Sequence, residues 1–335
     1  MCVLVTGSAG FIGAATVQKL LARGEDVIGI DNHNNYYDPS LKEARLNIFK
    51  ANTNYTHIRE DITNQSKIDS IFKKYRPNKV IHLAAQAGVR DSLDHPQKYI
   101  DTNLSGFINI LEASNDYHIS HLVYASSSSV YGKNAKLPYH EDDTTDHSAS
   151  LYGASKKANE VIAHSYSSNY NLSTTGLRFF TVYGPWGRPD MACFKFVDSI
   201  INDRSIDVYN HGNHSRDFTY IDDITDGVLN VLDKPSKIDI NWDPKEPLLS
   251  SSSVPWRIYN IGNGKPVDLM DYIKEIEIYL NKKAIINYMP KQKGDVDNTL
   301  ADVSKIKRDF NFVPKTNIQY GIAEFINWYI NFYKS

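Results

Sequence analysis

The chain opens with a short apolar segment that runs directly into the glycine-rich stretch "TGSAGFIG" and then into a helix-like pattern. Gly7, Gly10 and Gly13 stand at this junction. Glycine permits a tight turn and lets backbone N–H groups approach a pyrophosphate, while the N-terminus of the following helix favours negative charge. The spacing is GxxGxxG rather than GxGxxG, and the glycines alone are a weak signal. Between a strand and a helix, they predict a dinucleotide-binding βαβ unit.

Strand-like and helix-like segments alternate through the first half of the chain. Amphipathic helix-like patterns cover residues 11–24 and 67–77, and the second is closed by Pro77. The alternation predicts right-handed βαβ units and a parallel sheet with helices on both faces. Further short apolar, strand-like segments lie at residues 25–31, 56–61, 79–85 and 121–127.

The second half is less regular. After about Gly184 the alternation loosens, and residues 234–256 contain four of the thirteen prolines, which indicates a long loop or insertion. We therefore expect an α/β fold, a Rossmann-type doubly wound parallel sheet with a smaller mixed α/β lobe. The expected NAD-binding domain covers residues 1–180 and the substrate lobe mainly 181–335, with the chain free to cross back between them.

Asp31 ends the second strand-like segment, near the distance at which an acid accepts hydrogen bonds from the adenosine ribose hydroxyls. Taken alone, it could be an ordinary surface residue. In the order strand, glycines, helix, strand and acid, it supports a nucleotide site. A carboxylate here would repel a ribose 2′-phosphate, which favours NAD over NADP.

Composition limits the other classes of function. The formal charge of −2 gives no electrostatic argument for nucleic acid or an anionic membrane. Cys2 and Cys193 fit no metal-ligand spacing and favour a reducing compartment, and the eleven histidines indicate no metal site. The N-terminus lacks a signal-peptide pattern, and no apolar run could span a bilayer. We expect a cytoplasmic protein without membrane insertion.

The stretch "LYGASKKANE" places Tyr152 and Lys156 at i and i+4, on one face of the predicted helix. A nearby ammonium, together with a positive nicotinamide ring, would stabilise the Tyr152 phenolate and lower its pKa. Tyr152 could then take a proton from a sugar hydroxyl as the nicotinamide takes the hydride. The spacing alone is common, but beside a nucleotide turn it indicates catalysis.

With the "LAAQAG" strand end and the serine-rich strand, these motifs resemble the extended short-chain dehydrogenase/reductases over nearly the whole chain. "RFFTVYGPWGRPDMA", "RDFTYIDDI", "RIYNIGN" and "KGDVDNTLADVSK" resemble the UDP-glucuronate 4-epimerases in particular. This resemblance implies that Ser127 is the third catalytic residue beside Tyr152. The cofactor site that it implies comprises Gly7, Gly10, Phe11, Ile12, Gly13, Asp31, Asn32, Asp61, Ile62, Leu83, Ala84, Ala85, Tyr152 and Lys156.

The resemblance also implies a nucleotide-sugar site. Arg216 and Asp295 would hold the nucleotide-diphosphate end, and Arg188 lies in the adjoining substrate loop. Each of the three, taken singly, would be interpreted as a surface ion-pairing residue.

The four serines of "YASSSSVYG" restrict the reaction. Related dehydratases carry "TDEVYG" here, with Asp and Glu as acid and base for elimination, whereas this chain has Ser128 and Ser129. Hydroxyls can donate to an anionic sugar that buried carboxylates would repel. Thr181 stands where UDP-galactose epimerases tend to have Asn, so the three hydroxyls predict a uronate clamp. The alternative is that the serines only satisfy a turn.

The sequence therefore predicts an NAD-dependent 4-epimerase that interconverts UDP-glucuronate and UDP-galacturonate through a 4-keto intermediate. The alternatives are a 4-epimerase of UDP-N-acetylglucosaminuronate or UDP-glucose, and a non-catalytic NAD-binding regulator. The family usually forms a homodimer through helices here expected at residues 101–114 and 151–166. Packing against the chain's own sheet would explain the apolar faces of these helices equally well.

Overall fold

The computed structural model describes residues 1–334. Its centre is a parallel sheet with the strand order β10-β6-β5-β4-β1-β2-β3. Strand order reverses beside β1, as in doubly wound nucleotide-binding folds, and this confirms the expected fold class. The strands are β1 (Cys2–Thr6), β2 (Asp26–Asp31), β3 (Tyr55–Arg59), β4 (Lys79–His82), β5 (His121–Ser127), β6 (Thr174–Phe179) and β10 (Trp256–Ile261).

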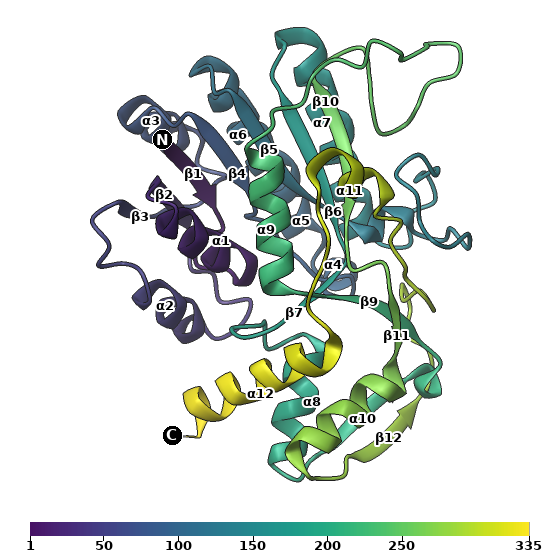
Figure 1. Cartoon of the computed structure of the whole chain (residues 1–335). Helices are drawn as coiled ribbons and strands as arrows, with labels where there is room; N and C mark the ends of the chain where they lie inside the picture. The colour runs from purple at the N-terminus through teal and green to yellow at the C-terminus, as the bar shows by residue number, and fades with distance from the viewer. Residues whose placement is uncertain (335) are drawn as a thin grey trace.

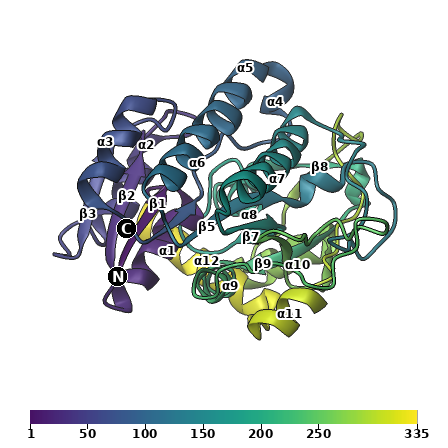
Figure 2. The ribbon, with the colours of Figure 1, turned by 90° about the horizontal axis from the view of Figure 1, so that it is seen from above.

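Helices cover both faces of the sheet, as Figures 1 and 2 show. Helices α1 (Phe11–Ala22) and α9 (Ile221–Leu232) pack against one face. Helices α3 (Gln65–Tyr75), α6 (Gly106–Asp116) and α7 (Leu151–Tyr170) cover the other. Successive residues of β1 contribute alternately to an apolar core on each side, as expected for a strand that is buried on both faces.

Shorter elements connect these layers. Helix α2 follows β2 and lies near the carboxyl end of the sheet (Figure 1). The short helical segments are α2 (Pro39–Asn47), α4 (Asp91–Asp94), α5 (Pro96–Tyr99), η1 (Ile100–Ser105), η2 (Ser128–Tyr131), η3 (Asn210–Gly212) and α11 (Ser304–Phe310).

Beyond β6 the chain builds two small sheets below the central sheet in Figure 1, with strand orders β11-β9-β7 and β12-β8. Between α9 and β11 the chain returns to the central sheet through β10, which pairs in parallel with β6. The elements of this part are β7 (Thr181–Tyr183), α8 (Ala192–Ile201), β8 (Ser205–Tyr209), β9 (Ser215–Tyr220), β11 (Pro266–Asp268), α10 (Leu269–Leu280), β12 (Ile285–Met289) and α12 (Ile318–Tyr333).

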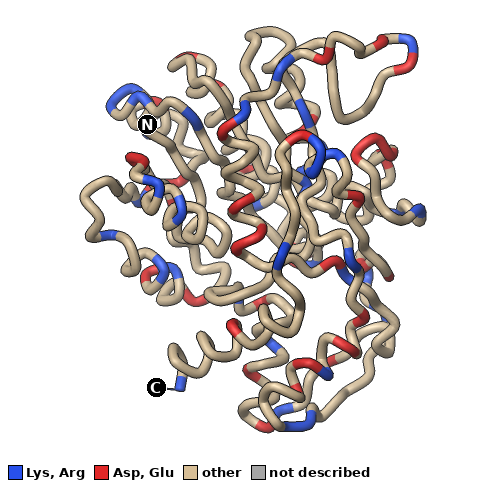
Figure 3. Tube along the Cα trace, viewed as in Figure 1, with Lys and Arg blue, Asp and Glu red and all other residues tan. Residues whose placement is uncertain are grey.

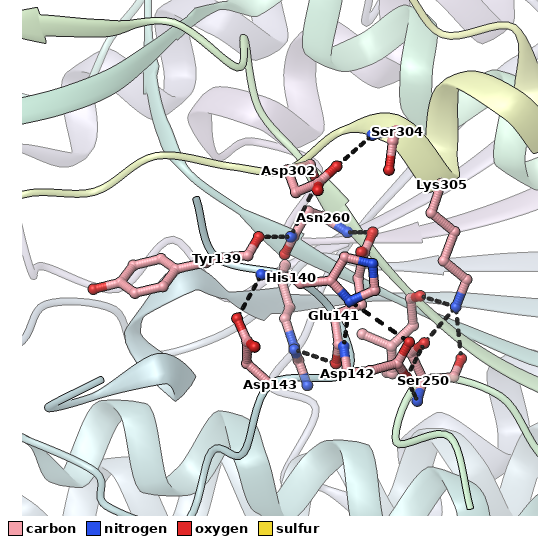
Figure 4. A network of polar contacts seen from close by, with 12 residues as sticks. Tyr139, His140, Glu141, Asp142, Asp143, Ser250, Asn260, Asp302, Ser304 and Lys305 are labelled. Carbon is pink, nitrogen blue, oxygen red and sulfur yellow. Dashed lines mark hydrogen bonds and ion pairs between the residues drawn. The ribbon is translucent and has the colours of Figure 1, made fainter. Parts of the chain in front are cut away.

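A long loop joins α9 to β10 and projects at the upper right of Figure 1, as the prolines of that region predicted. Its last part is fixed by the polar network of Figure 4. The backbone N–H and the hydroxyl of Ser250 donate to Asp142 at 2.8 and 2.7 Å, and Lys305 donates to the Ser250 carbonyl at 3.1 Å. The Asn260 N–H donates to Glu141 at 2.9 Å. These bonds anchor the segment between η2, which follows Ser127, and α7, which carries Tyr152 and Lys156.

Charged residues of both signs are interspersed along the chain rather than gathered into one basic stripe (Figure 3). Within residues 1–334, none of the helices combines the length and the apolar character needed to cross a bilayer.

Candidate active site

A cleft of about 1070 Å³ opens at the carboxyl ends of the central strands, next to the small sheets. Open α/β sheets bind ligands at this edge, where the strand order reverses. Every site residue expected from the sequence lines this cleft except Asp61. The expected residues that line it are Gly7, Gly10, Phe11, Ile12, Gly13, Asp31, Asn32, Ile62, Leu83, Ala84, Ala85, Ser127, Ser128, Ser129, Tyr152, Lys156, Thr181, Arg188, Arg216 and Asp295.

The glycine turn has the geometry that a pyrophosphate requires. Gly7 has φ +70°, and its N–H donates to the Ile30 carbonyl at 2.7 Å. A Cβ on Gly13 would lie 1.9 Å from the Gly7 carbonyl oxygen, so only glycine fits there. Helix α1 begins at Phe11, directly beside the turn, and presents its N-terminus to the cleft. This arrangement fits a dinucleotide cofactor.

Asp31 is buried at the end of β2. Its carboxylate accepts the N–H of Ala9 at 3.1 Å and that of His33 at 2.9 Å, and Lys42 lies 3.7 Å away. The acid therefore holds the glycine turn as well as facing the cleft.

Asp61 does not line the cleft. Its carboxylate accepts hydrogen bonds from Asn32 at 2.7 Å and from the Thr63 N–H at 2.9 Å. These bonds hold the pKa of Asp61 below its usual value, although burial acts in the opposite direction. Asp61 thus supports Asn32, which does reach the cleft.

Ser127, Tyr152 and Lys156 come together from β5 and α7. Ser127 is the last residue of β5, and its hydroxyl accepts the N–H of Ser129 at 3.1 Å. Tyr152 lies in the first turn of α7, which Ser150 caps by accepting the Gly153 N–H at 3.1 Å. The Lys156 ammonium, one turn further on, donates to the Ala125 carbonyl at 2.9 Å. The strand and the helix therefore present the three side chains to one part of the cleft.

Burial shifts the pKa values of Tyr152 and Lys156. Burial raises the pKa of Tyr152, while the Ser127 hydroxyl and the Arg188 charge act to lower it. Burial also lowers the pKa of Lys156 to about 8. In the chain itself, burial outweighs the neighbouring charges. The expected lowering of the Tyr152 pKa depends on Lys156 together with the positive nicotinamide ring, and it stays a prediction for the NAD-bound protein.

The serine run divides into separate roles. The Ser126 hydroxyl is engaged within the fold, because it donates to the buried carboxylate of Glu160 at 2.6 Å. Ser128 and Ser129 begin η2 and line the cleft. A Cβ on Gly153 would lie 2.5 Å from the Ser129 carbonyl oxygen, so this glycine allows α7 to pack closely on the serine turn.

Arg188 follows β7 and forms a two-pronged ion pair with Asp190, in which Nε to Oδ1 is 2.9 Å. Its guanidinium lies 5.6 Å from the centre of the Tyr36 ring. Thr181, the first residue of β7, also lines the cleft. The Arg188 charge is close enough to Tyr152 to act on its pKa.

Arg216 and Asp295 also line the cleft. Arg216 donates to the carbonyls of Asp297 at 2.7 Å and Val296 at 2.8 Å, and Asp295 pairs with Arg90 at 3.1 Å. Arg216 therefore holds the backbone of residues 296–297, whereas Asp295 takes part in a partly exposed ion pair.

The sequence reasoning missed several cleft residues that lie outside the strand ends. Tyr36, Lys42 and Asp190 line the cleft, but no local motif marks them. Among residues 1–334, no group of three or more His, Cys, Asp or Glu side chains could hold a metal ion.

The doubly wound sheet, the glycine turn and the acid after β2 define the class of protein, a Rossmann-type dinucleotide-binding protein. Residues 3–262 match the model of the NAD dependent epimerase/dehydratase family. The chain belongs to this family, and its cofactor is NAD.

Full-length relatives show which members of the family the chain is similar to. The chain is 50% identical to Protein CapI of Staphylococcus aureus, with all of both chains covered. It is 42% identical to a probable UDP-glucuronate 4-epimerase of Rhizobium meliloti, over 99% of this chain and 97% of the relative. The crystal structure of UDP-glucuronic acid 4-epimerase from Bacillus cereus, in complex with UDP-glucuronic acid and NAD, matches with a TM-score of 0.89. That match has 30% identity and covers 99% of this chain and all of the other. The resemblance found in the sequence is confirmed.

Proposed function

We propose that this protein is an NAD-dependent isomerase that interconverts UDP-glucuronate and UDP-galacturonate through a 4-keto intermediate. The observation that carries the proposal is the meeting of Ser127, Tyr152 and Lys156 beside a cleft wall with hydroxyls at positions 128 and 129. The full-length relatives named UDP-glucuronate 4-epimerases support the same reaction.

Tyr152 is the proposed acid and base. Its phenolate takes the proton of the sugar 4-hydroxyl and later returns a proton to the 4-oxygen on the other face. Ser127 hydrogen-bonds that oxygen and fixes its position. The Lys156 ammonium, held by the Ala125 carbonyl at 2.9 Å, contributes the positive charge that favours the phenolate. When bound, NAD supplies the acceptor and donor of the C4 hydride, so the reaction has no net redox change.

The Gly7–Gly13 turn would hold the cofactor pyrophosphate, and Asp31 would accept from the adenosine ribose. Leu83, Ala84 and Ala85 would line the adjoining wall, from the end of β4. Arg216 and Asp295 would hold the diphosphate end of the substrate. The 4-keto sugar would turn about its diphosphate linkage to present its other face.

The sugar carboxylate requires restraint, because the 4-keto intermediate is a β-keto acid that can lose carbon dioxide. Ser128, Ser129 and Thr181 supply hydroxyl donors, and Arg188 adds positive charge near Tyr152. Donors that favour the charged carboxylate oppose the movement of charge out of it during decarboxylation. The absence of Asp and Glu at positions 128 and 129 also removes the acid/base pair that elimination of water would need.

We propose further that the enzyme is a cytoplasmic homodimer. The outer side of the α4, α6 and α7 layer exposes Leu93, Ile108 and Val161, which a second copy could cover. Cys2 and Cys193 are both unpaired, which agrees with a reducing compartment.

The test is product analysis of a panel of UDP-sugars by chromatography and NMR, without added reductant. The panel contains UDP-glucuronate, UDP-N-acetylglucosaminuronate and UDP-glucose. We expect UDP-galacturonate from UDP-glucuronate at the highest kcat/KM. A preference for one of the other sugars would change the substrate assignment, and stoichiometric consumption of NADPH would exclude an epimerase. Binding of NAD without turnover of any sugar would favour a regulator.

A further inference from the structure

Arg45 on α2 is fully buried and has no part in the mechanism above. Its guanidinium donates to the Trp186 carbonyl from Nε at 3.1 Å and from Nη2 at 2.7 Å. The same guanidinium donates from Nη1 to the Ala9 carbonyl at 3.1 Å. One side chain thus joins two loops that are far apart in the sequence.

The first of these loops belongs to the cofactor site. Ala9 lies within the glycine turn, between Gly7 and Gly10. Its N–H donates to the Asp31 carboxylate at 3.1 Å, while its carbonyl accepts from Arg45. The Asp31 carboxylate and the Arg45 guanidinium therefore hold this part of the turn from two sides. A ligand that orders the turn or engages Asp31 also orders the partner of Arg45.

The second loop belongs to the substrate site. Trp186 lies two residues before Arg188 and has φ +65°, a left-handed conformation that large side chains rarely adopt. Its ring packs against Trp328 at 5.1 Å and Phe332 at 5.0 Å between centroids. Its carbonyl is fixed by two Arg45 donors. A backbone conformation that is unfavourable in isolation is maintained by its neighbours, so loss of Arg45 would release it.

The segment between Asp31 and Arg45 makes further contacts with the substrate loop. The Tyr36 hydroxyl lies 3.4 Å from Asp190, and the Arg188 guanidinium lies over the Tyr36 ring. The Tyr37 hydroxyl accepts from Arg45 Nη1 at 2.6 Å. The segment from Asp31 to Arg45 therefore connects the acid of the cofactor site to the loop that carries Arg188.

We infer that Arg45 is a positioning residue that couples occupation of the adenosine end of the cofactor site to the conformation of residues 184–190. A ligand on the glycine turn would fix the Ala9 carbonyl, the guanidinium and the Trp186 carbonyl in turn, and Arg188 would then be set for the sugar carboxylate. The inference rests on the proposed function for the identity of the sugar. Coupling of this kind is reciprocal, since each ligand strengthens binding of the other by the same factor.

The test measures UDP-glucuronate affinity by calorimetry on the cofactor-free full chain, with and without saturating ADP-ribose. ADP-ribose fills the adenosine end but lacks the nicotinamide, so direct contact between that ring and the sugar cannot produce the coupling. We expect ADP-ribose to tighten UDP-glucuronate binding by at least about fivefold, the lower end of typical coupling. The coupling ratio is the Kd of UDP-glucuronate without ADP-ribose divided by the Kd with it. In Arg45→Lys, which keeps the charge but loses the two-pronged geometry, this ratio should fall to near one.

A purely structural role for Arg45 would lower stability without changing the ratio. Arg257→Lys is the control for this, because Arg257 is largely buried far along the chain and donates to the Trp256 carbonyl at 2.9 Å. Its ratio should equal that of the parent. If Arg45→Lys does not fold, Tyr37→Phe removes only the hydroxyl that Arg45 contacts, and the ratio should fall at least twofold.

The outcomes separate the two proposals. A parent that binds UDP-glucuronate no more tightly than UDP contradicts the proposed function. A parent with that preference but with a ratio of one contradicts the coupling alone. An unchanged ratio in Arg45→Lys, or in Tyr37→Phe where that variant is used, assigns the coupling elsewhere and overturns the role of Arg45.

Discussion

The hydroxyl of Ser126 on β5 donates to the carboxylate of Glu160 on α7 at 2.6 Å, and this bond joins the strand that carries Ser127 to the helix that carries Tyr152. Glu160 also forms a buried two-pronged ion pair with Arg178, at 2.8 and 2.9 Å. Arg178 holds the pKa of Glu160 below its usual value despite the burial. The ion pair fixes α7 against the central sheet close to the catalytic residues.

We therefore predict that Glu160→Gln lowers the free energy of unfolding by about 3–5 kcal/mol, because it leaves the Arg178 charge buried without an ionic partner. Urea denaturation measures the loss. Lys283→Ala removes an exposed ion pair with Glu277 and should cost no more than about 1 kcal/mol. Equal effects of the two substitutions would show that the buried pair is not a structural anchor.

Tyr152→Phe should reduce kcat by at least about 10²–10⁴-fold, the usual contribution of a general acid or base. Only the hydroxyl is lost, so the affinity for UDP-glucuronate, measured by calorimetry, should stay within a few-fold of the parent. Turnover close to that of the parent would require another group as the base.

Lys156 gives the chain a specific dependence of stability on pH. Its pKa is about 8 in the folded chain and 10.5 in an ordinary environment, so the unfolded chain binds more protons between these values. The penalty for burying the ammonium is therefore complete below about pH 8 and declines as the pH rises toward 10.5.

The expected observable is the difference in unfolding free energy between Lys156→Met and the parent without added cofactor. Because the parent loses its penalty as the pH rises, it should gain about 2–3 kcal/mol of stability relative to the variant between pH 7 and pH 10. Denaturant titrations at several pH values provide the measurement. A difference that does not change with pH would mean that Lys156 keeps its ordinary pKa in the fold.

The double substitution Ser128→Ala/Ser129→Ala tests the uronate clamp. Each lost hydrogen bond to the carboxylate should weaken UDP-glucuronate binding by about 1.5–3 kcal/mol, while UDP binding serves as the control and should change little. A decarboxylated UDP-pentose should appear or increase among the products. Equal losses for both ligands, with no pentose, would leave the two serines a structural role only.

Local motifs made much of this site predictable. The glycine turn, Asp31 and the Tyr152–Lys156 pair each combine a residue type with a fixed spacing, and the parallel sheet brings strand ends to one edge. Arg45 and Trp186 are 141 positions apart in the sequence, and Ser126 and Glu160 are 34 apart. No local sequence pattern therefore predicts these two contacts.

Other features of the site depend on contacts and burial that the sequence does not show. Asp61 supports Asn32, because Asn32 and Thr63 donate to its carboxylate. The pKa of Tyr152 is raised because burial, which the spacing of Tyr152 and Lys156 cannot reveal, outweighs the nearby charge of Arg188. Ser126 serves the fold although it belongs to the same serine run as Ser127.

The central claim is that the C4 hydride leaves the sugar and returns to the same molecule. The direct test is conversion of UDP-glucuronate that carries deuterium at C4, in ordinary water, with NMR analysis of the UDP-galacturonate formed. We expect the product to keep the deuterium at C4, because the cofactor that accepts the hydride stays bound until it returns it. Replacement of the deuterium by protium from the solvent would contradict this mechanism.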